Sequence, residues 1–203
     1  MRIREVDEKM IHRVSPISKD NKKMSLLISS SACIPLFDIE KRKVFRQLVG
    51  HTGVIRDVIS DINGALSLTC SEDNSAKCWD LRVFKPAVTL EGHKGVVTTG
   101  SIANSDSSTL CFTGATDKCI KVWDLRNNKP LYELATGCNV PIRLSWHEKT
   151  STLTCLSGNV LENQHLDEDG WPSQGRIAKA KNHWRGVPWN LGGHALISYI
   201  FKG

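Results

Sequence analysis

The sequence predicts an all-β fold in which four-stranded antiparallel sheets are repeated along the chain. Residues 50–82 and 92–126 are similar to each other, because both open with Gly-His and close with Trp-Asp-Leu-Arg. Within each copy, short apolar runs alternate with turn signals, and no helical period is present. A single four-stranded sheet cannot bury both of its faces, so the copies are expected to stack on one another.

Turn signals separate the expected strands of the first strong copy. Asp61-Ile62-Asn63-Gly64 divides an apolar run at 54–59 from a second run at 65–70. A tight turn at 72–74 then leads into a third strand, which ends at the Trp-Asp pair.

The second strong copy keeps this order and nearly the same spacing. His51 and His93 are 42 residues apart, whereas Trp79 and Trp123 are 44 apart. The extra length falls in the polar turn 104–108, where an insertion costs least.

These repeats resemble the WD-repeat β-propeller family. The resemblance rests on Gly-His, an Asp in the tight turn and Trp-Asp, at Gly50-His51, Asp73, Trp79-Asp80 and at Gly92-His93, Asp117, Trp123-Asp124. It implies blades of four antiparallel strands stacked around an axis. Only about four repeats fit this chain, so the resemblance implies a partial or C-terminally capped propeller.

Weaker copies set the expected domain limits. Blades are predicted over 1–158: a degenerate one at about 10–48, strong ones at 50–91 and 92–136, and the start of a degenerate one at 138–158. In the first of these, Phe37-Asp38 takes the Trp-Asp position and Ser31 stands where the tight-turn Asp is expected.

The remaining residues, 159–203, are predicted to form an irregular, aromatic-containing segment that ends in a strand at about 192–202. Trp171, Trp184 and Trp189 lie in this segment, and three large aromatic side chains in water would be costly. We expect them to pack against the last blade; the alternative is a loop that docks a partner.

The resemblance also implies a buried chain of hydrogen bonds in each strong blade. An imidazole, a carboxylate and an indole N–H each need a partner when they are buried. Such a His, Thr and Asp set also occurs in hydrolytic sites, but its recurrence in each blade, with its own Trp, favours a structural role and a non-enzymatic protein. These sets are His51, Thr69, Asp73, Trp79 and His93, Thr113, Asp117, Trp123.

Partner-binding candidates lie on the rim of the disc that the resemblance implies. In each blade, one candidate is the residue on the first-strand bulge and the other is the residue before the tight-turn Asp. These are Arg56 and Glu72 in one blade, and Thr98 and Thr116 in the next. Charges and hydroxyls suit a polar peptide or protein, and the alternative for each residue is a side chain that only faces water.

Two further candidates are Arg82 and Arg126, which end the two Trp-Asp-Leu-Arg segments. This ending resembles the Trp-Asp-x-Arg box through which many WD-repeat proteins dock to the adaptor of cullin-RING ubiquitin ligases. An Arg at this place can grip carboxylates or carbonyls in two-point fashion. The alternative is that each Arg bonds a neighbouring loop carbonyl.

Composition narrows the classes of partner. The formal net charge is +6, and residues 1–50 hold 11 Lys and Arg against 6 Asp and Glu. Because these charges are spread among acids, they favour a solvated surface over a nucleic-acid site. RNA or phospholipid binding through the basic N-terminal region remains the alternative from another class.

The seven cysteines include no C-x-x-C pair, which favours reduced thiols and a cytoplasmic or nuclear protein. We expect no metal, cofactor, small-molecule substrate or membrane span. The sequence therefore predicts a non-catalytic scaffold for protein or peptide partners, with possible association through open blade edges.

Overall fold

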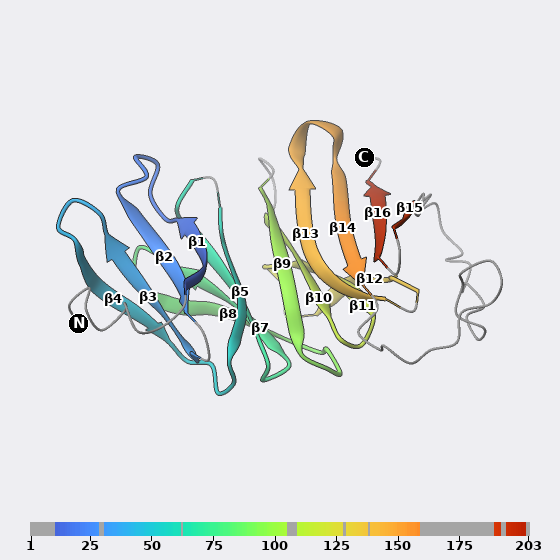
Figure 1. Cartoon of the computed structure of the whole chain (residues 1–203), viewed down its shortest axis with the longest axis horizontal. Coiled ribbons are helices and arrows are strands. Elements are labelled where there is room, and N and C mark those ends of the chain that lie inside the picture. Colours follow the sequence, from blue (N-terminus) through green and yellow to red (C-terminus); the bar gives the residue numbers. More distant parts are fainter. Residues whose placement is uncertain are drawn as a thin grey trace.

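Four antiparallel sheets follow one another along the chain, each with four strands (Figure 1). The structure is a computed structural model, and it describes residues 11–28, 31–61, 63–104, 109–127, 129–137, 139–158, 189–191 and 194–201. We call the sheets the first to fourth blades, in chain order. The all-β architecture of repeated four-stranded antiparallel sheets expected from the sequence is confirmed.

The first three blades have the same topology, in which strand order in the sheet equals strand order in the chain. The first blade contains β1 (Ile11–Pro16), β2 (Lys23–Ile28), β3 (Cys33–Asp38) and β4 (Lys43–Val49). The second contains β5 (Ile55–Ser60), β6 (Leu66–Ser71), β7 (Ser75–Asp80) and β8 (Lys85–Glu91). The third contains β9 (Val97–Asn104), β10 (Thr109–Ala115), β11 (Cys119–Asp124) and β12 (Pro130–Ala135).

The fourth blade departs from this topology. Its strands are β13 (Val140–His147), β14 (Thr152–Gly158), β15 (Trp189–Leu191) and β16 (His194–Ile200), with the short 3-10 helix η2 (Glu148–Thr150) between the first two. The order in the sheet is β13-β14-β16-β15, so the last strand of the chain takes the third position. The residues expected to be irregular, including Trp171 and Trp184, lie outside the described residues, and of Trp189 only the strand is described.

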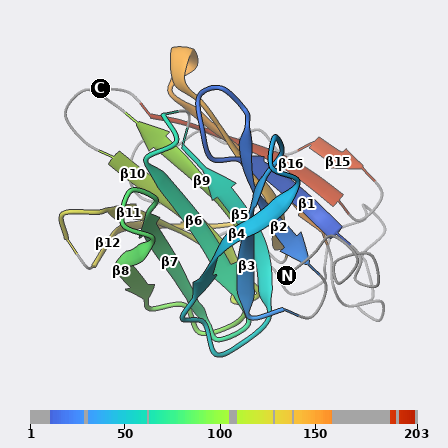
Figure 2. The same cartoon turned by 90° about the vertical axis from the view of Figure 1, so that its left-hand side faces the viewer.

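Apolar side chains fill the spaces between neighbouring sheets. Leu36, Val58 and Trp79 belong to the cluster between the first and second blades, and a second cluster joins the second and third blades. Phe112 and Leu153 belong to the cluster between the third and fourth blades. Figure 2, turned so that the first-blade side faces the viewer, shows the sheets one behind another. Stacking thus buries both faces of the middle sheets.

The first strand of each blade carries an irregularity at the same place. The pairing register shifts just before Arg13 in β1, Asp57 in β5, Thr99 in β9 and Arg143 in β13. These four residues are therefore equivalent positions of the four blades. Among the residues that the structure describes, none belongs to a helix long and apolar enough to cross a bilayer.

Candidate functional site

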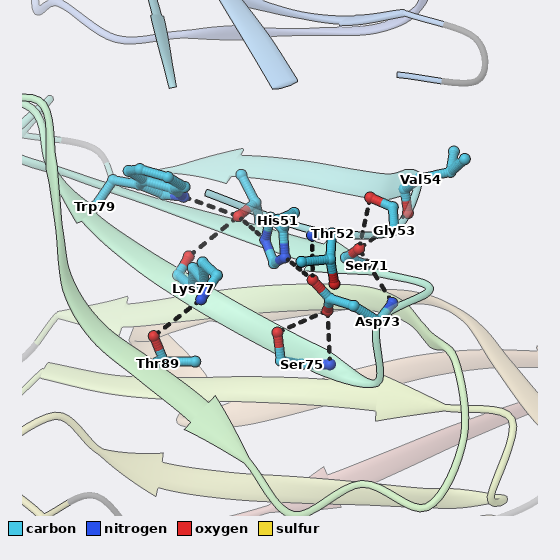
Figure 3. A network of polar contacts seen from close by, with 11 residues as sticks. His51, Thr52, Gly53, Val54, Ser71, Asp73, Ser75, Lys77, Trp79 and Thr89 are labelled. Carbon is cyan, nitrogen blue, oxygen red and sulfur yellow. Dashed lines mark hydrogen bonds and ion pairs between the residues drawn. The ribbon is translucent and has the colours of Figure 1, made fainter. Parts of the chain in front are cut away.

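The four side chains predicted to interact in the second blade lie together in a chain of hydrogen bonds (Figure 3). His51 Nδ1 lies 2.7 Å from Asp73 Oδ2, and His51 Nε2 lies 2.7 Å from Thr69 Oγ1. Trp79 Nε1 donates to the same Thr69 hydroxyl oxygen at 2.8 Å. Three segments are joined in this way: the loop before β5, the strand β6, and the β6–β7 turn with β7.

The third blade repeats this arrangement almost atom for atom. His93 Nδ1 lies 2.9 Å from Asp117 Oδ2, and its Nε2 lies 2.8 Å from Thr113 Oγ1. Trp123 Nε1 donates to Thr113 Oγ1 at 2.7 Å. In both blades the carboxylate also accepts a backbone N–H from the residue after the His, Thr52 or Lys94.

The electrostatics of these sets oppose a catalytic use. Burial lowers the pKa of His51, and Asp73 only partly opposes this effect. Burial acts to raise the pKa of Asp73, but hydrogen bonds from Ser75, His51 and the Thr52 N–H outweigh it and lower the pKa to about 2. The His51 side chain is fully buried, and both ring nitrogens are used within the blade. A neutral, enclosed imidazole of this kind positions a loop and has no access to a substrate.

The first blade uses a hydroxyl where the strong blades use a carboxylate. Ser31, at the position where the sequence predicts the tight-turn Asp, accepts the Cys33 N–H at 3.2 Å. Asp73 accepts the Ser75 N–H at 3.0 Å in the same way. The degenerate turn therefore keeps one bond of the motif without the charge.

The rim candidates fall into two kinds. Arg56 forms an ion pair with Glu72, and both side chains keep part of their surface in water. Thr116 is exposed, whereas the Thr98 hydroxyl lies 2.6 Å from the carbonyl oxygen of Pro141 in the next blade. Thr98 thus joins two blades, and the other three residues keep side-chain surface in water.

Arg82 and Arg126 each form a two-point hydrogen-bonded ion pair with the Asp of their own Trp-Asp pair. Arg82 Nε donates to Asp80 Oδ1 at 3.0 Å and its Nη2 to Oδ2 at 2.6 Å. Arg126 makes the same two bonds to Asp124. These hydrogen bonds lower the pKa of both aspartates to about 2. The Arg82 side chain is 78% exposed and that of Arg126 is 70% exposed, so both guanidinium groups lie on the surface.

A buried carboxylate that the sequence reasoning missed joins all four blades. Asp57 on β5 is fully buried. Its Oδ1 accepts hydrogen bonds from Arg13 of β1, from Arg143 of β13 at 3.1 Å and from the Val58 N–H at 3.0 Å. Its Oδ2 accepts from the Thr99 hydroxyl at 3.0 Å, and the Gly100 N–H lies 3.4 Å away. One signal could have found it: a carboxylate between Ile55 and Val58, in an apolar strand, requires partners.

A cavity of about 490 Å³ lies at the other end of these first strands. It is lined by Pro16 of β1, Ser60 of β5, Asn104 of β9 and Trp146 of β13, among others. Ser60 Oγ and Trp146 Nε1 are buried and have no hydrogen-bond partner within the described part of the chain.

Comparison with protein families supports the repeat assignment. The family model described as "WD domain, G-beta repeat" matches residues 42–80 and 84–124. The chain carries WD repeats. Each matched unit spans the last strand of one blade and the first three strands of the next, β4 with β5–β7 and β8 with β9–β11. A single WD repeat therefore links two sheets covalently.

Curated relatives match about two fifths of the chain. Nuclear distribution protein PAC1 of Arthroderma otae is 32% identical over 87 residues, which are 41% of this chain and 19% of that protein. WD repeat and SOCS box-containing protein 1 of Homo sapiens is 34% identical over 84 residues, which are 40% of this chain and 20% of that protein. The alignments thus span about a fifth of the length of these relatives.

Most of the described cysteines are buried within the blades. The six described cysteines are free thiols, of which Cys70, Cys78, Cys111 and Cys155 are buried. Burial raises the pKa of Cys155 to about 12, so this thiol packs as a small apolar group. In the described ranges, no three His, Cys, Asp or Glu side chains are grouped so that they could hold a metal ion.

Proposed function

We propose that this chain is a non-catalytic scaffold that presents the rim of its WD-repeat blades to a protein or peptide. The proposal rests on one contrast. The His, Thr, Asp and Trp side chains hydrogen-bond to one another within their own blades, whereas charged side chains of the same blades lie on the surface. WD repeats as a family serve protein interaction. Function in such a repeat protein is carried by loops and strand ends.

The experiment should change the rim without changing the blade. Exchanging the ion pair, Arg56→Glu with Glu72→Arg, keeps both the pair and the net charge but reverses the charges that a partner meets. Bound proteins are enriched from a lysate on wild-type and exchanged protein and compared by quantitative mass spectrometry. We expect a defined set of proteins to be lost from the exchanged protein, whose melting temperature should be unchanged. Equal enrichment on both proteins would contradict a role for this rim.

A second candidate is a substrate receptor of a cullin-RING ubiquitin ligase. Its support is that Arg82 and Arg126, equivalent residues of adjacent blades, both leave most of their side chains in water. Binding of the purified adaptor is measured for wild type, Arg82→Ala, Arg126→Ala and the double variant. Arg46→Ala, which removes an exposed Arg from β4, is the matched control. Each interface Arg should contribute about tenfold or more in affinity if it is an anchor. Failure of the wild type to bind, or equal binding by the double variant, rejects this function.

A further inference from the structure

Two guanidinium groups compete for a single carboxylate oxygen at the first strands of the blades. Arg13 of the first blade and Arg143 of the fourth both donate to Asp57 Oδ1 through their Nη1 atoms. The cluster therefore holds two positive charges against one negative charge. Because Asp57 also accepts two backbone N–H groups and the Thr99 hydroxyl, it has no capacity left to satisfy either guanidinium further.

Each guanidinium keeps most of its hydrogen-bonding capacity. An Arg side chain has five N–H donors in a planar fork. Within the described ranges, each of these two makes one hydrogen bond, to Asp57. The Arg13 side chain is 30% exposed and that of Arg143 is 50% exposed. Their free donors are thus open to solvent, while the carboxylate that anchors them is not.

The anchoring also makes the pair ready to bind. Asp57 is fixed from the second blade by Val58 and from the third by Thr99. The Thr99 hydroxyl oxygen in turn accepts the Leu144 N–H of β13, the residue next to Arg143. Two long side chains are therefore held near one point before any ligand arrives, which lowers the entropy cost of binding. Planar forks of this kind recognise an oxyanion by paired, charge-assisted bonds.

We propose that Arg13 and Arg143 form an anion-binding site that receives an acidic side chain of a peptide partner. This site deepens the proposed scaffold function, because it names the chemistry of one group that the scaffold would recognise. The excess positive charge and the outward-facing donors match a carboxylate, and a phosphorylated side chain offers the same oxyanion chemistry. The site is distinct from the Arg56–Glu72 pair, whose charges satisfy each other.

The test uses the full chain and three labelled peptides in a fluorescence-polarisation titration. One peptide carries Glu residues in a Gly and Ser background, the second has Gln in their place, and the third has phosphoserine in their place. The variants are Arg143→Gln, Arg13→Gln and Arg143→Lys, which keeps the charge but loses the fork. Arg46→Gln is the matched control, because it removes the same charge from another exposed Arg, on β4.

We expect the wild type to bind the Glu or the phosphoserine peptide and not the Gln peptide. Loss of one charged partner should weaken binding about tenfold or more, and Arg143→Lys should weaken it less than Arg143→Gln. Arg46→Gln should leave the affinity unchanged. The stronger of the two binding peptides identifies carboxylate or phosphate as the preferred ligand.

Two results would overturn the proposal: a wild type that binds neither acidic peptide, or Arg13→Gln and Arg143→Gln variants that bind as tightly as Arg46→Gln. A melting curve shows whether each variant is folded, and Arg143→Gln leaves Asp57 paired with Arg13. If neither acidic peptide binds but proteins are still enriched in the rim experiment, the scaffold function stands and only the anion site is rejected. If the peptides bind but no protein is enriched, the scaffold function fails while the site stands.

Discussion

Replacing Asp57 by Asn should lower the free energy of unfolding more than the other acid-to-amide changes, Asp73→Asn and Glu40→Gln. The amide oxygen can still accept from Val58 and from the two arginines, but it no longer balances their charge. The amide NH₂ replaces Oδ2 and therefore meets the Gly100 N–H, so that two donors face each other in a buried site. Thr99 offers little relief, because its hydroxyl now donates to Oδ2 and would lose its own acceptor if it turned to accept from the NH₂.

The magnitude follows from these contacts. A buried donor left without an acceptor costs about 1–3 kcal/mol. The two ion pairs involve partly exposed guanidinium groups, so each loss is discounted to about 0.5–1 kcal/mol. Together they predict a loss of about 2–5 kcal/mol in the free energy of unfolding, with additivity assumed.

Urea unfolding followed by tryptophan fluorescence measures this loss. Glu40→Gln is the control, because it removes one carboxylate from an exposed pair with Lys22 and should leave the urea midpoint unchanged. A double variant with Arg143→Gln should lose less than the sum of the two single losses, since one bond is removed twice. If Asp57→Asn unfolds at the same urea concentration as Glu40→Gln, Asp57 does not hold the blades together.

Three further predictions concern the hydrogen-bonded sets of the blades and the Trp146 ring. Asp73→Asn and His93→Ala should each lower the free energy of unfolding by about 1–3 kcal/mol through orphaned polar groups, and unchanged melting of both would reject a structural role. Trp146→Ala should cost about 3–5 kcal/mol, because the ring stacks on Phe112 with centroids 5.2 Å apart; Trp146→Phe, which keeps the stacking and removes the unpartnered N–H, should cost far less in the same urea assay. Stability should also fall on acidification. The folded chain lowers the pKa of His51 and His93, so below the ordinary value of 6.5 the unfolded chain binds more protons and is favoured. The folded chain also lowers the pKa of Asp73, so the stability that this carboxylate contributes is lost as the pH falls from 3.8 to about 2. Melting temperatures that stay constant from neutral pH down to about pH 4 would contradict this last prediction.

Features that recur in the chain were predictable from the sequence. His51, Thr69 and Trp79 have counterparts at a nearly constant spacing, so self-comparison finds the set without any knowledge of its geometry. Chemistry then supplies the bonds, because each buried polar group in the set needs a partner that another member provides. The strand order of the first three blades follows in the same way from the alternation of short apolar runs and turns.

The fourth blade was only partly predictable, because its strands are not consecutive in the chain. β13 and β14 form an ordinary hairpin around η2. The third position is taken by β16, which pairs with β14 across a long insertion, and β15 then pairs with β16 from the outside. A local pattern indicates that 194–200 is a strand, but which edge it joins depends on a contact between residues far apart in the sequence.

Asp57 was missed for a different physical reason. The register shift in each first strand places equivalent residues of the four blades around one centre, and these residues are Arg13, Asp57, Thr99 and Arg143. A repeat search scores such a position as noise, because the residues share neither size nor charge. Because the backbone repeats, these four side chains converge. Because the four residue types differ, one carboxylate is shared by two arginines and a hydroxyl. In a stacked-blade protein, then, the conserved geometry builds the support, and the positions at which the repeats disagree are where a specific charge can be placed.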